Sequence, residues 1–412
     1  MIKGIDPPVE PFPYKRTKEV LEEMRYNNYV DVQLNPLPYL RDVPLEEKQS
    51  LFISKVRQCT NIVRGPARET KYTILVELRD FVRDKQATLS PTVVCPEVIR
   101  MFLAHLTWIN CPGEPRPLDY DDYEIEDEII HTHFPELSIL YQLILYCLQT
   151  IFSDPSGLEN VVDRILVHKI LNQFQSDCPA ERTYMKMILF RIYRNFRNLQ
   201  SFIRKQISNI LLSFIYERED FAGIREILIL YESIETELAL PLENEHKLFL
   251  QKVLIPLHGT KSFPIFQEEL YSCLAEYVYM DSSLGKMILD GMIAYWPKNN
   301  SRKEIVFLRQ MREFASTMGA VDFPAILEPY YRHLSKVALT NHFKVADELI
   351  GLLKDDFIFR TIEEYSELLM PIIVPALKRI SEEHWNNMIA YQARKTLRRL
   401  EKWSFNLHST CM

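Results

Sequence analysis

Apolar residues recur along this chain with the three-to-four-residue spacing of amphipathic helices. In the segment LEEKQSLFISKVRQCTNIV, the apolar side chains near one helical stripe are those of Leu45, Leu51, Phe52, Val56 and Cys59. Similar patterns predict helices at about 68–84, 93–109, 134–152 and 158–176, then two helices within 182–216, and continue without a convincing strand to about Lys402. The pattern therefore predicts an all-α protein.

Two late segments of the chain resemble each other. Each runs from a proline through an apolar helix and a short polar turn to a histidine and an aromatic residue that open a second helix. Pro329 and Pro375 lie 46 residues apart, and His342 and His384 lie 42 apart. Helix pairs that recur at this period are typical of HEAT and armadillo repeats. We therefore favour a solenoid of HEAT-like (armadillo-like) helical repeats over an ordinary all-helical domain.

The distribution of prolines and charges predicts the domain organisation. Residues 1–44 are rich in proline and charge, and we expect an extended, partly disordered arm there. The solenoid is expected at 45–403, and 404–412 form a C-terminal tail. Within the solenoid, 111–133 combine prolines with seven carboxylates between Asp119 and Glu128, so we expect a long acidic loop.

Composition limits the class of protein. The net charge of -7 argues against generic binding to nucleic acid or to an anionic membrane. The seven cysteines are scattered without a C-x-x-C pair, and the first residues contain no secretory apolar region. The most apolar run, 137–152, is too short and too polar for a membrane span. We expect a cytoplasmic protein, with the nucleus as a second compartment.

The sequence contains no recognisable catalytic motif. The chain lacks glycine-rich phosphate loops, the H-E-x-x-H zinc motif and the G-x-S-x-G nucleophile motif. His131 and His133 form an H-x-H pair beside acids, but no histidine or cysteine at ligand spacing completes a metal site. The acidic run Asp119 to Glu128 lacks the spacing of a calcium loop, so a solvated loop is the stronger interpretation. We expect no cofactor and favour an interaction protein over an enzyme.

One stretch of the chain, 182–216, contains no Asp or Glu. Its seven basic residues are Arg182, Lys186, Arg191, Arg194, Arg197, Arg204 and Lys205. On a helix, Arg191 and Arg194 share a face at i, i+3, and Tyr193 and Arg197 are neighbours at i, i+4. Arginines beside aromatic side chains suit a short acidic peptide with hydrophobic anchors. The alternatives are a structural role, with arginines paired to acids such as Glu226 or Glu232 on the next helix, and RNA binding.

Several stretches resemble the B-prime family of regulatory subunits of protein phosphatase type 2A. They include YLRDVPLEEKQSLFISKVRQC (39–59), FRIYRNFRNLQSFIRKQISNILLSFIYE (190–217), ALPLENEHKLFLQKVLIPLH (239–258) and EPYYRHLSKVALTNHFKVAD (328–347). The similar stretches are spread over nearly the whole chain from about 39 to 400.

The resemblance implies a non-catalytic subunit of a heterotrimer with a scaffold subunit and a metal-dependent catalytic subunit. It also implies that the chain selects substrates by holding a short Leu-x-x-Ile-x-Glu motif in a concave groove. The positions that match this groove are Arg191, Tyr193, Arg204, Leu230, Ile234 and His246. Arg191 would receive the glutamate of the motif, and Leu230 and Ile234 would line an apolar pocket. We expect no nucleic-acid partner and no membrane insertion.

The groove departs from the family pattern in several places. Phe190 replaces a histidine, Gln200 an arginine and Glu243 a lysine, whereas Arg194 and Arg197 add charge where the family has other residues. We expect a peptide groove with shifted specificity. The alternative function is a HEAT-repeat adaptor or transport receptor for other cargo.

Overall fold

The computed structural model describes residues 34–63, 66–84, 89–106, 134–176, 178–217, 221–238, 240–297 and 299–410. Within these ranges every regular element is a helix, which confirms the all-α prediction. The chain forms two compact units. Unit 1 comprises Met1–Ile207 and Asp220–Leu230, and unit 2 comprises Ser208–Glu219 and Tyr231–Met412. The predicted loop at 111–133 and its His131–His133 pair lie outside the described residues.

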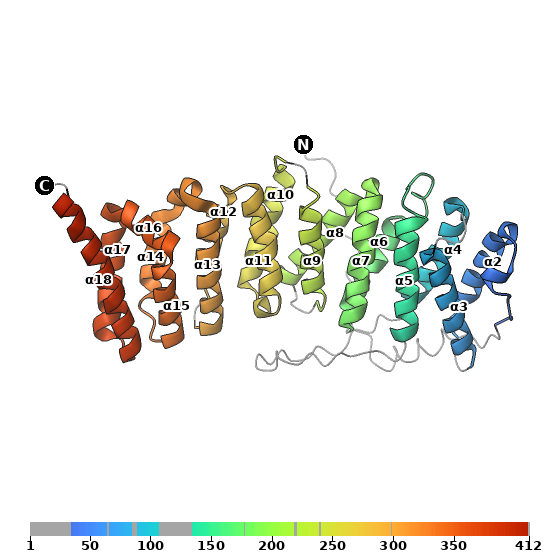
Figure 1. Ribbon diagram of the computed structural model, residues 1–412, viewed down its shortest axis with the longest axis horizontal. Coiled ribbons are helices and arrows are strands. Elements are labelled where there is room, and N and C mark those ends of the chain that lie inside the picture. The colour runs from blue at the N-terminus through green and yellow to red at the C-terminus, as the bar shows by residue number, and fades with distance from the viewer. Residues whose placement is uncertain are drawn as a thin grey trace. The chain divides into compact units, whose positions relative to one another are not determined.

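Unit 1 contains helices stacked in two layers (Figure 1). They are η1 (Leu40–Asp42), α2 (Leu45–Cys59), α3 (Pro66–Arg83), α4 (Pro91–Leu106), α5 (Phe134–Thr150), α6 (Arg164–Asn172), η2 (Gln173–Gln175) and α7 (Pro179–Asn195). Helix α3 packs on α5 and α5 on α7, while α2 packs on α4 and α4 on α6. Helices α8 (Arg197–Tyr216) and α9 (Ile224–Glu235) each contribute residues to both units.

Unit 2 has the same two-layer stacking. Its helices are α10 (Asn244–Phe249), η3 (Leu250–Leu254), η4 (Ile255–Gly259), α11 (Phe263–Met280), α12 (Leu284–Ala294), α13 (Ser301–Asp322), η5 (Phe323–Ile326), α14 (Leu327–Val337), α15 (Phe343–Lys354), α16 (Asp356–Glu364), α17 (Ser366–Glu383) and α18 (Asn387–Thr410). One layer stacks α11, α13, α15 and α18, and the other stacks α12, α14 and α17. This stacking of successive helix pairs is the arrangement of a helical-repeat solenoid.

The two similar segments of the sequence form equivalent helix pairs, α14 with α15 and α17 with α18. His342 stacks on Phe343 and His384 stacks on Trp385 in the two equivalent turns. The turns also contact each other, because Trp385 Nε1 donates a hydrogen bond to the backbone oxygen of Asn341 at 2.8 Å. The proline-to-histidine repeat therefore corresponds to a structural repeat.

Local sequence determines where several helices begin. Proline is the first residue of α3, α4 and α7, where its missing N–H costs no helical hydrogen bond. Helix α6 begins at Arg164, later than the predicted 158, because the Asp163 carboxylate accepts from the Leu166 backbone N–H at 2.9 Å. Helix α18 continues to Thr410, past the end of its apolar pattern at Lys402. The domain boundaries at 44 and 403 stay predictions.

The predicted buried helix at 137–152 corresponds to α5. Leu137, Leu143 and Leu148 are each at most 3% exposed. Among the helices of the described residues, none is both long and apolar enough to cross a membrane. The apolar run therefore forms part of the core of unit 1.

Candidate functional site

The start of α7 is held by a buried polar network in unit 1. The Arg182 guanidinium donates to Glu226 Oε1 at 2.9 Å and to the backbone oxygen of Ser176 at 2.9 Å. The Glu181 carboxylate accepts from Tyr141 Oη and, at 2.5 Å, from Ser176 Oγ. Arg182 and Glu226 are both buried, so the structural alternative holds for this arginine.

Glycine 223 allows the start of α9 to reach this network. A Cβ at Gly223 would lie 2.4 Å from the backbone oxygen of Phe174, which is too close for any other residue without a shift. The close approach places Glu226 on the first turn of α9, within reach of Arg182.

The turn from α7 to α8 positions the next part of the site. Helix α7 ends at Asn195, and Phe196 has a non-helical backbone with φ -114 and ψ 88. The prediction that Tyr193 and Arg197 are i, i+4 neighbours on one helix is therefore wrong, because the helix stops between them. Gln200 Nε2 donates to the backbone oxygen of Tyr193 at 3.0 Å, which ties α8 back to the end of α7.

Two of the predicted site residues contact each other across this turn. Arg204 Nη1 donates to Tyr193 Oη at 3.1 Å, and the Tyr193 ring is only 2% exposed. Arg191 is half-buried on α7 and forms no ion pair with another described residue. Arg194 and Arg197 are exposed, and Phe190 is half-buried. The structure thus joins Tyr193 with Arg204, whereas Arg191 has no ion-pair partner among the described residues.

Leu230 and Ile234 lie four residues apart on α9 and share one helix face. Both side chains are completely buried. Within unit 2, His246 lies on the short helix α10 and is 6% exposed. Its backbone oxygen accepts from Tyr277 Oη at 3.1 Å. Glu243 is exposed at the residue before α10.

A buried polar cluster of unit 2 was not expected from the sequence. Tyr231 Oη and Tyr277 Oη are hydrogen-bonded at 2.9 Å, and both rings are buried. Glu235 follows Tyr231 by one helical turn and is 1% exposed, with no hydrogen-bond partner for either carboxylate oxygen. Burial, followed by the charges of Glu276 and Glu232, raises the pKa of Glu235 well above 4.5. Burial therefore favours the neutral form of this carboxyl. An acid inside an apolar helix stripe is the signal that sequence inspection could have used.

The other buried cations of unit 1 have partners within the fold. Lys55 pairs with Glu77, and Lys71 pairs with Glu136 at 2.8 Å. Lys71 Nζ also lies 2.8 Å from His105 Nε2, and burial lowers the pKa of His105 to about 3. A neutral imidazole can accept a hydrogen bond from the ammonium, so this cluster needs no ligand.

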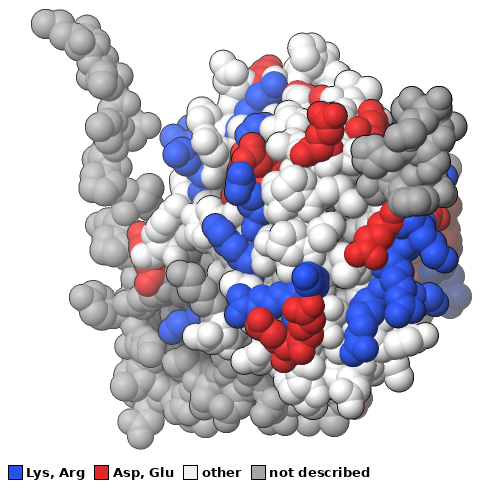
Figure 2. Space-filling view, turned by 90° about the vertical axis from the view of Figure 1, so that its left-hand side faces the viewer, with Lys and Arg blue, Asp and Glu red and all other residues white. Residues whose placement is uncertain are grey.

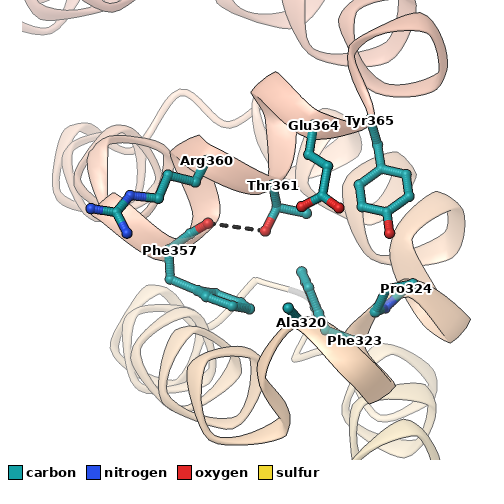
Figure 3. A pocket seen from close by; sticks show the side chains of 8 residues that line it. All are labelled: Ala320, Phe323, Pro324, Phe357, Arg360, Thr361, Glu364 and Tyr365. Carbon is teal, nitrogen blue, oxygen red and sulfur yellow. Dashed lines mark hydrogen bonds between the residues drawn. The ribbon is translucent and has the colours of Figure 1, made fainter.

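A small cavity of about 200 Å³ lies in unit 2 beside α16 (Figure 3). Phe323 and Phe357 contribute aromatic walls, with ring centroids 5.6 Å apart. Thr361 Oγ1 donates to the backbone oxygen of Phe357 at 2.9 Å, so this hydroxyl is not poised as a nucleophile. Among the described residues, no group of three or more His, Cys, Asp or Glu could hold a metal ion.

Comparison with known families decides the class of this chain. A family model described as "Protein phosphatase 2A regulatory B subunit (B56 family)" matches residues 37–412. The chain belongs to the B56 family. It is 34% identical over 375 residues to the mouse "Serine/threonine-protein phosphatase 2A 56 kDa regulatory subunit alpha isoform", covering 89% of this chain and 76% of that protein. It is also 34% identical over 390 residues to the 55 kDa B-prime delta isoform of the phosphatase 2A regulatory subunits from Arabidopsis thaliana, covering 91% of this chain and 81% of that protein.

Membership of the B56 family confirms the resemblance to B-prime regulatory subunits. It also confirms the helical-repeat fold class and the prediction of a phosphatase regulator in place of an enzyme.

Proposed function

We propose that this B56-family chain targets a type 2A phosphatase to substrates by holding short acidic linear motifs in a concave groove. In this proposal the chain joins a scaffold subunit and a catalytic subunit in a heterotrimer. Its expected location is the cytoplasm and also the nucleus. The residues proposed to take part in motif binding, from the family resemblance, are Arg191, Tyr193, Arg204, Leu230, Ile234 and His246.

The environment of Arg191 is the observation that supports the groove most directly. Arg191 lies in a stretch without carboxylates and is half-buried without an ion pair among the described residues. A guanidinium can bind a carboxylate through two parallel hydrogen bonds. The Arg204–Tyr193 hydrogen bond fixes a second cation near the end of the same helix. These features favour the glutamate of a Leu-x-x-Ile-x-Glu peptide as the ligand.

The apolar part of the proposed groove places a condition on binding. Leu230 and Ile234 are fully buried, so a peptide side chain touches them only when neighbouring side chains shift. We therefore expect peptide binding to be accompanied by a local rearrangement around α9.

The test is titration of an acidic Leu-x-x-Ile-x-Glu peptide against the wild type and Arg191→Ala. A hydrogen bond to a charged group contributes about 1.5–3 kcal/mol, so the substitution should weaken binding by roughly 10- to 150-fold. Lys205→Ala is the matched control, because Lys205 is an exposed cation of α8 outside the proposed groove. No binding to the wild type, or equal losses in both variants, would refute the site.

Affinity purification from the native cells tests the proposed partners. Scaffold and catalytic subunits should co-purify with the chain and dephosphorylate a substrate that carries the motif. Recovery of a small GTPase or unrelated cargo without a phosphatase would instead support the adaptor alternative.

A further inference from the structure

The outward face of α18 carries a line of basic side chains. These residues, named here the α18 basic stripe, are Arg394, Lys395, Arg398 and Lys402. At about 100° per residue they fall within one stripe about 100° wide. The opposite face packs in the core through Ile389, Ala393 and Leu400. Figure 2, which views the end of the chain that carries α18, shows a band of basic side chains.

Among the residues whose side chains are described, no carboxylate forms an ion pair with the α18 basic stripe. A fifth cation of the helix, Arg399, differs because its guanidinium lies 3.7 Å from the centroid of the Phe359 ring. Arg399 therefore packs on α16, whereas the stripe faces solvent.

The spacing within the α18 basic stripe is unfavourable for the isolated helix. Arg394 and Arg398 are i, i+4 neighbours, and so are Arg398 and Lys402, so like charges repel along one face. The helix dipole does not account for the stripe, since α18 ends at Thr410, two turns beyond Lys402, and the dipole acts within the last turn. An unpaired and mutually repelling line of cations indicates a surface for something negative.

A neighbouring lysine reports the positive potential beside the stripe. Lys354 of α15 donates a hydrogen bond from Nζ to Gln392 Oε1 on α18. Burial lowers the pKa of Lys354, and the charge of Lys395 lowers it further, while Asp347 acts in the opposite direction. Lys395 of the stripe is therefore close enough to α15 to disfavour the charge on Lys354.

Apolar side chains continue the line toward the start of α18. Met388 is 64% exposed and Tyr391 is 60% exposed. Tyr391 lies on the same face as Arg394 and Arg398, since three and seven residues separate them. From Tyr391 to Lys402 the helix rises about 16 Å at 1.5 Å per residue. An extended segment of about five residues has this length, at about 3.3 Å per residue.

We propose that the α18 basic stripe binds a short acidic segment of a partner protein. The segment has about four carboxylates or phosphates and a hydrophobic residue at one end, which rests on Met388 and Tyr391. Arginine guanidinium groups match both anions through two hydrogen bonds. This site is separate from the peptide groove in the proposed function and does not depend on it.

Size and flanking charge favour a short peptide over a broader anion. The stripe is one helix face about 12 Å long from Arg394 to Lys402. An exposed acid, Glu401, lies next to Lys402 and three residues after Arg398 on α18 itself, and Glu382 and Glu383 are exposed at the end of α17. A membrane or a duplex nucleic acid would meet these acids and the net charge of -7 of the whole chain. A narrow acidic segment would contact the stripe alone, so it would be repelled less by these acids and by the net negative charge of the chain.

The experiment is fluorescence titration of the full chain with a labelled peptide, Tyr followed by five Glu, at 50 and 200 mM salt. The wild type should bind, and the higher salt should weaken binding several-fold. Arg394→Glu/Arg398→Glu should weaken binding at least tenfold, whereas Arg394→Lys/Arg398→Lys should retain most of the affinity. The matched control is Lys336→Glu/Lys344→Glu, which reverses two exposed lysines on α14 and α15 and should change binding less than twofold.

Four outcomes would overturn the proposal. They are no binding to the wild type, equal losses in the stripe and control variants, displacement by an unlabelled Leu-x-x-Ile-x-Glu peptide, and tighter binding to anionic vesicles or to RNA than to the peptide. Circular dichroism of each variant separates lost binding from lost folding. Because Arg191→Ala should leave this titration unchanged, failure of the groove and failure of the stripe are distinguishable.

Discussion

Helices α7 and α18 are both rich in arginine and lysine, but the fold uses their charges in opposite ways. In α7, Arg182 is buried and bonded to Glu226 at 2.9 Å. In α18, Arg394 and Arg398 face solvent without an ion pair among described side chains. Basic stretches can therefore have different roles. A buried cation beside a carboxylate stabilises the fold, whereas an exposed cation without a carboxylate partner can bind a ligand.

The two regions also differ in energetic cost. A buried cation loses hydration, and removal of its partner leaves an uncompensated charge inside the protein. An exposed cation keeps its hydration, and its repulsion from a neighbour one turn away costs only about 0.2–0.5 kcal/mol. Charge substitutions should therefore destabilise the fold at α7 and stabilise the helix at α18.

The largest expected effect is from Arg182→Ala. It leaves Glu226 buried without its ion-pair partner, which should cost about 3–5 kcal/mol in the free energy of unfolding. Urea denaturation measures the loss. Lys186→Ala on the same helix is the control, because Lys186 is half-buried and has no ion pair among the described residues, and it should cost less than about 1 kcal/mol. Equal losses in the two variants would show that the buried Arg182–Glu226 ion pair does not contribute more to the free energy of unfolding than the Lys186 side chain.

A pH-dependent effect is expected at Glu235. Its carboxyl is neutral in the folded state up to a raised pKa, whereas in the unfolded chain it ionises near 4.5. The unfolded state therefore binds fewer protons between these two pKa values, and stability contributed by this group falls as pH rises through that window. Glu235→Gln should therefore stabilise the protein at pH 8, because the amide carries no charge that burial would disfavour.

The same Glu235→Gln variant should gain little at pH 4, where the carboxyl is mostly protonated in both states. Urea denaturation of wild type and variant at several pH values gives the comparison. A gain that is the same at pH 4 and pH 8 would argue that Glu235 is not held neutral.

A smaller loss is expected from Tyr193→Phe. The change removes the hydroxyl that accepts from Arg204 Nη1 at 3.1 Å and leaves the ring packed. A hydrogen bond of this kind contributes about 0.5–1.5 kcal/mol to stability. Thermal unfolding should show a lower midpoint, and affinity for the acidic peptide should fall as Arg204 loses its fixed position. Unchanged affinity would remove Arg204 from the groove.

The smallest expected effect has the opposite sign. Arg398→Glu turns its two repulsive i, i+4 contacts, with Arg394 and Lys402, into attractive ones. The same change brings two acids together at i, i+3, because Glu401 lies three residues further along. At about 0.2–0.5 kcal/mol per pair, the net gain is about 0.5 kcal/mol. Slower amide hydrogen exchange in α18 would report this gain. Faster exchange would mean that the stripe supports the helix after all.

The fold could be predicted well because its signals are local and repeated. Apolar spacing predicted a helix at 134–152, and the structure has α5 at Phe134–Thr150. The Pro329–His342 and Pro375–His384 segments corresponded to stacked helix pairs. Boundaries were less predictable where one side chain decided them. The Asp163 cap delays α6, and the non-helical Phe196 separates Tyr193 from Arg197.

The candidate site was only partly predictable, because the sequence alone does not show which charged side chains form ion pairs in the folded protein. Arg182 and Arg191 lie in the same basic stretch and could not be distinguished by composition. Only Arg182 forms an ion pair with Glu226, because Gly223 lets the start of α9 approach the backbone of Phe174 closely. The Tyr231–Tyr277 pair joins residues 46 positions apart, which no spacing rule connects. The sequence contains the four cations of the α18 basic stripe, but a helical repeat pattern alone assigns no function to an outward face.

The central claim is that Arg191 receives the glutamate of an acidic motif. A double-mutant cycle measures this directly, by titrating Leu-x-x-Ile-x-Glu and Leu-x-x-Ile-x-Gln peptides against the wild type and Arg191→Ala. If the guanidinium and the carboxylate interact, the two losses should not add, with a coupling energy of about 1.5–3 kcal/mol. Additive losses would contradict the account and place the glutamate elsewhere.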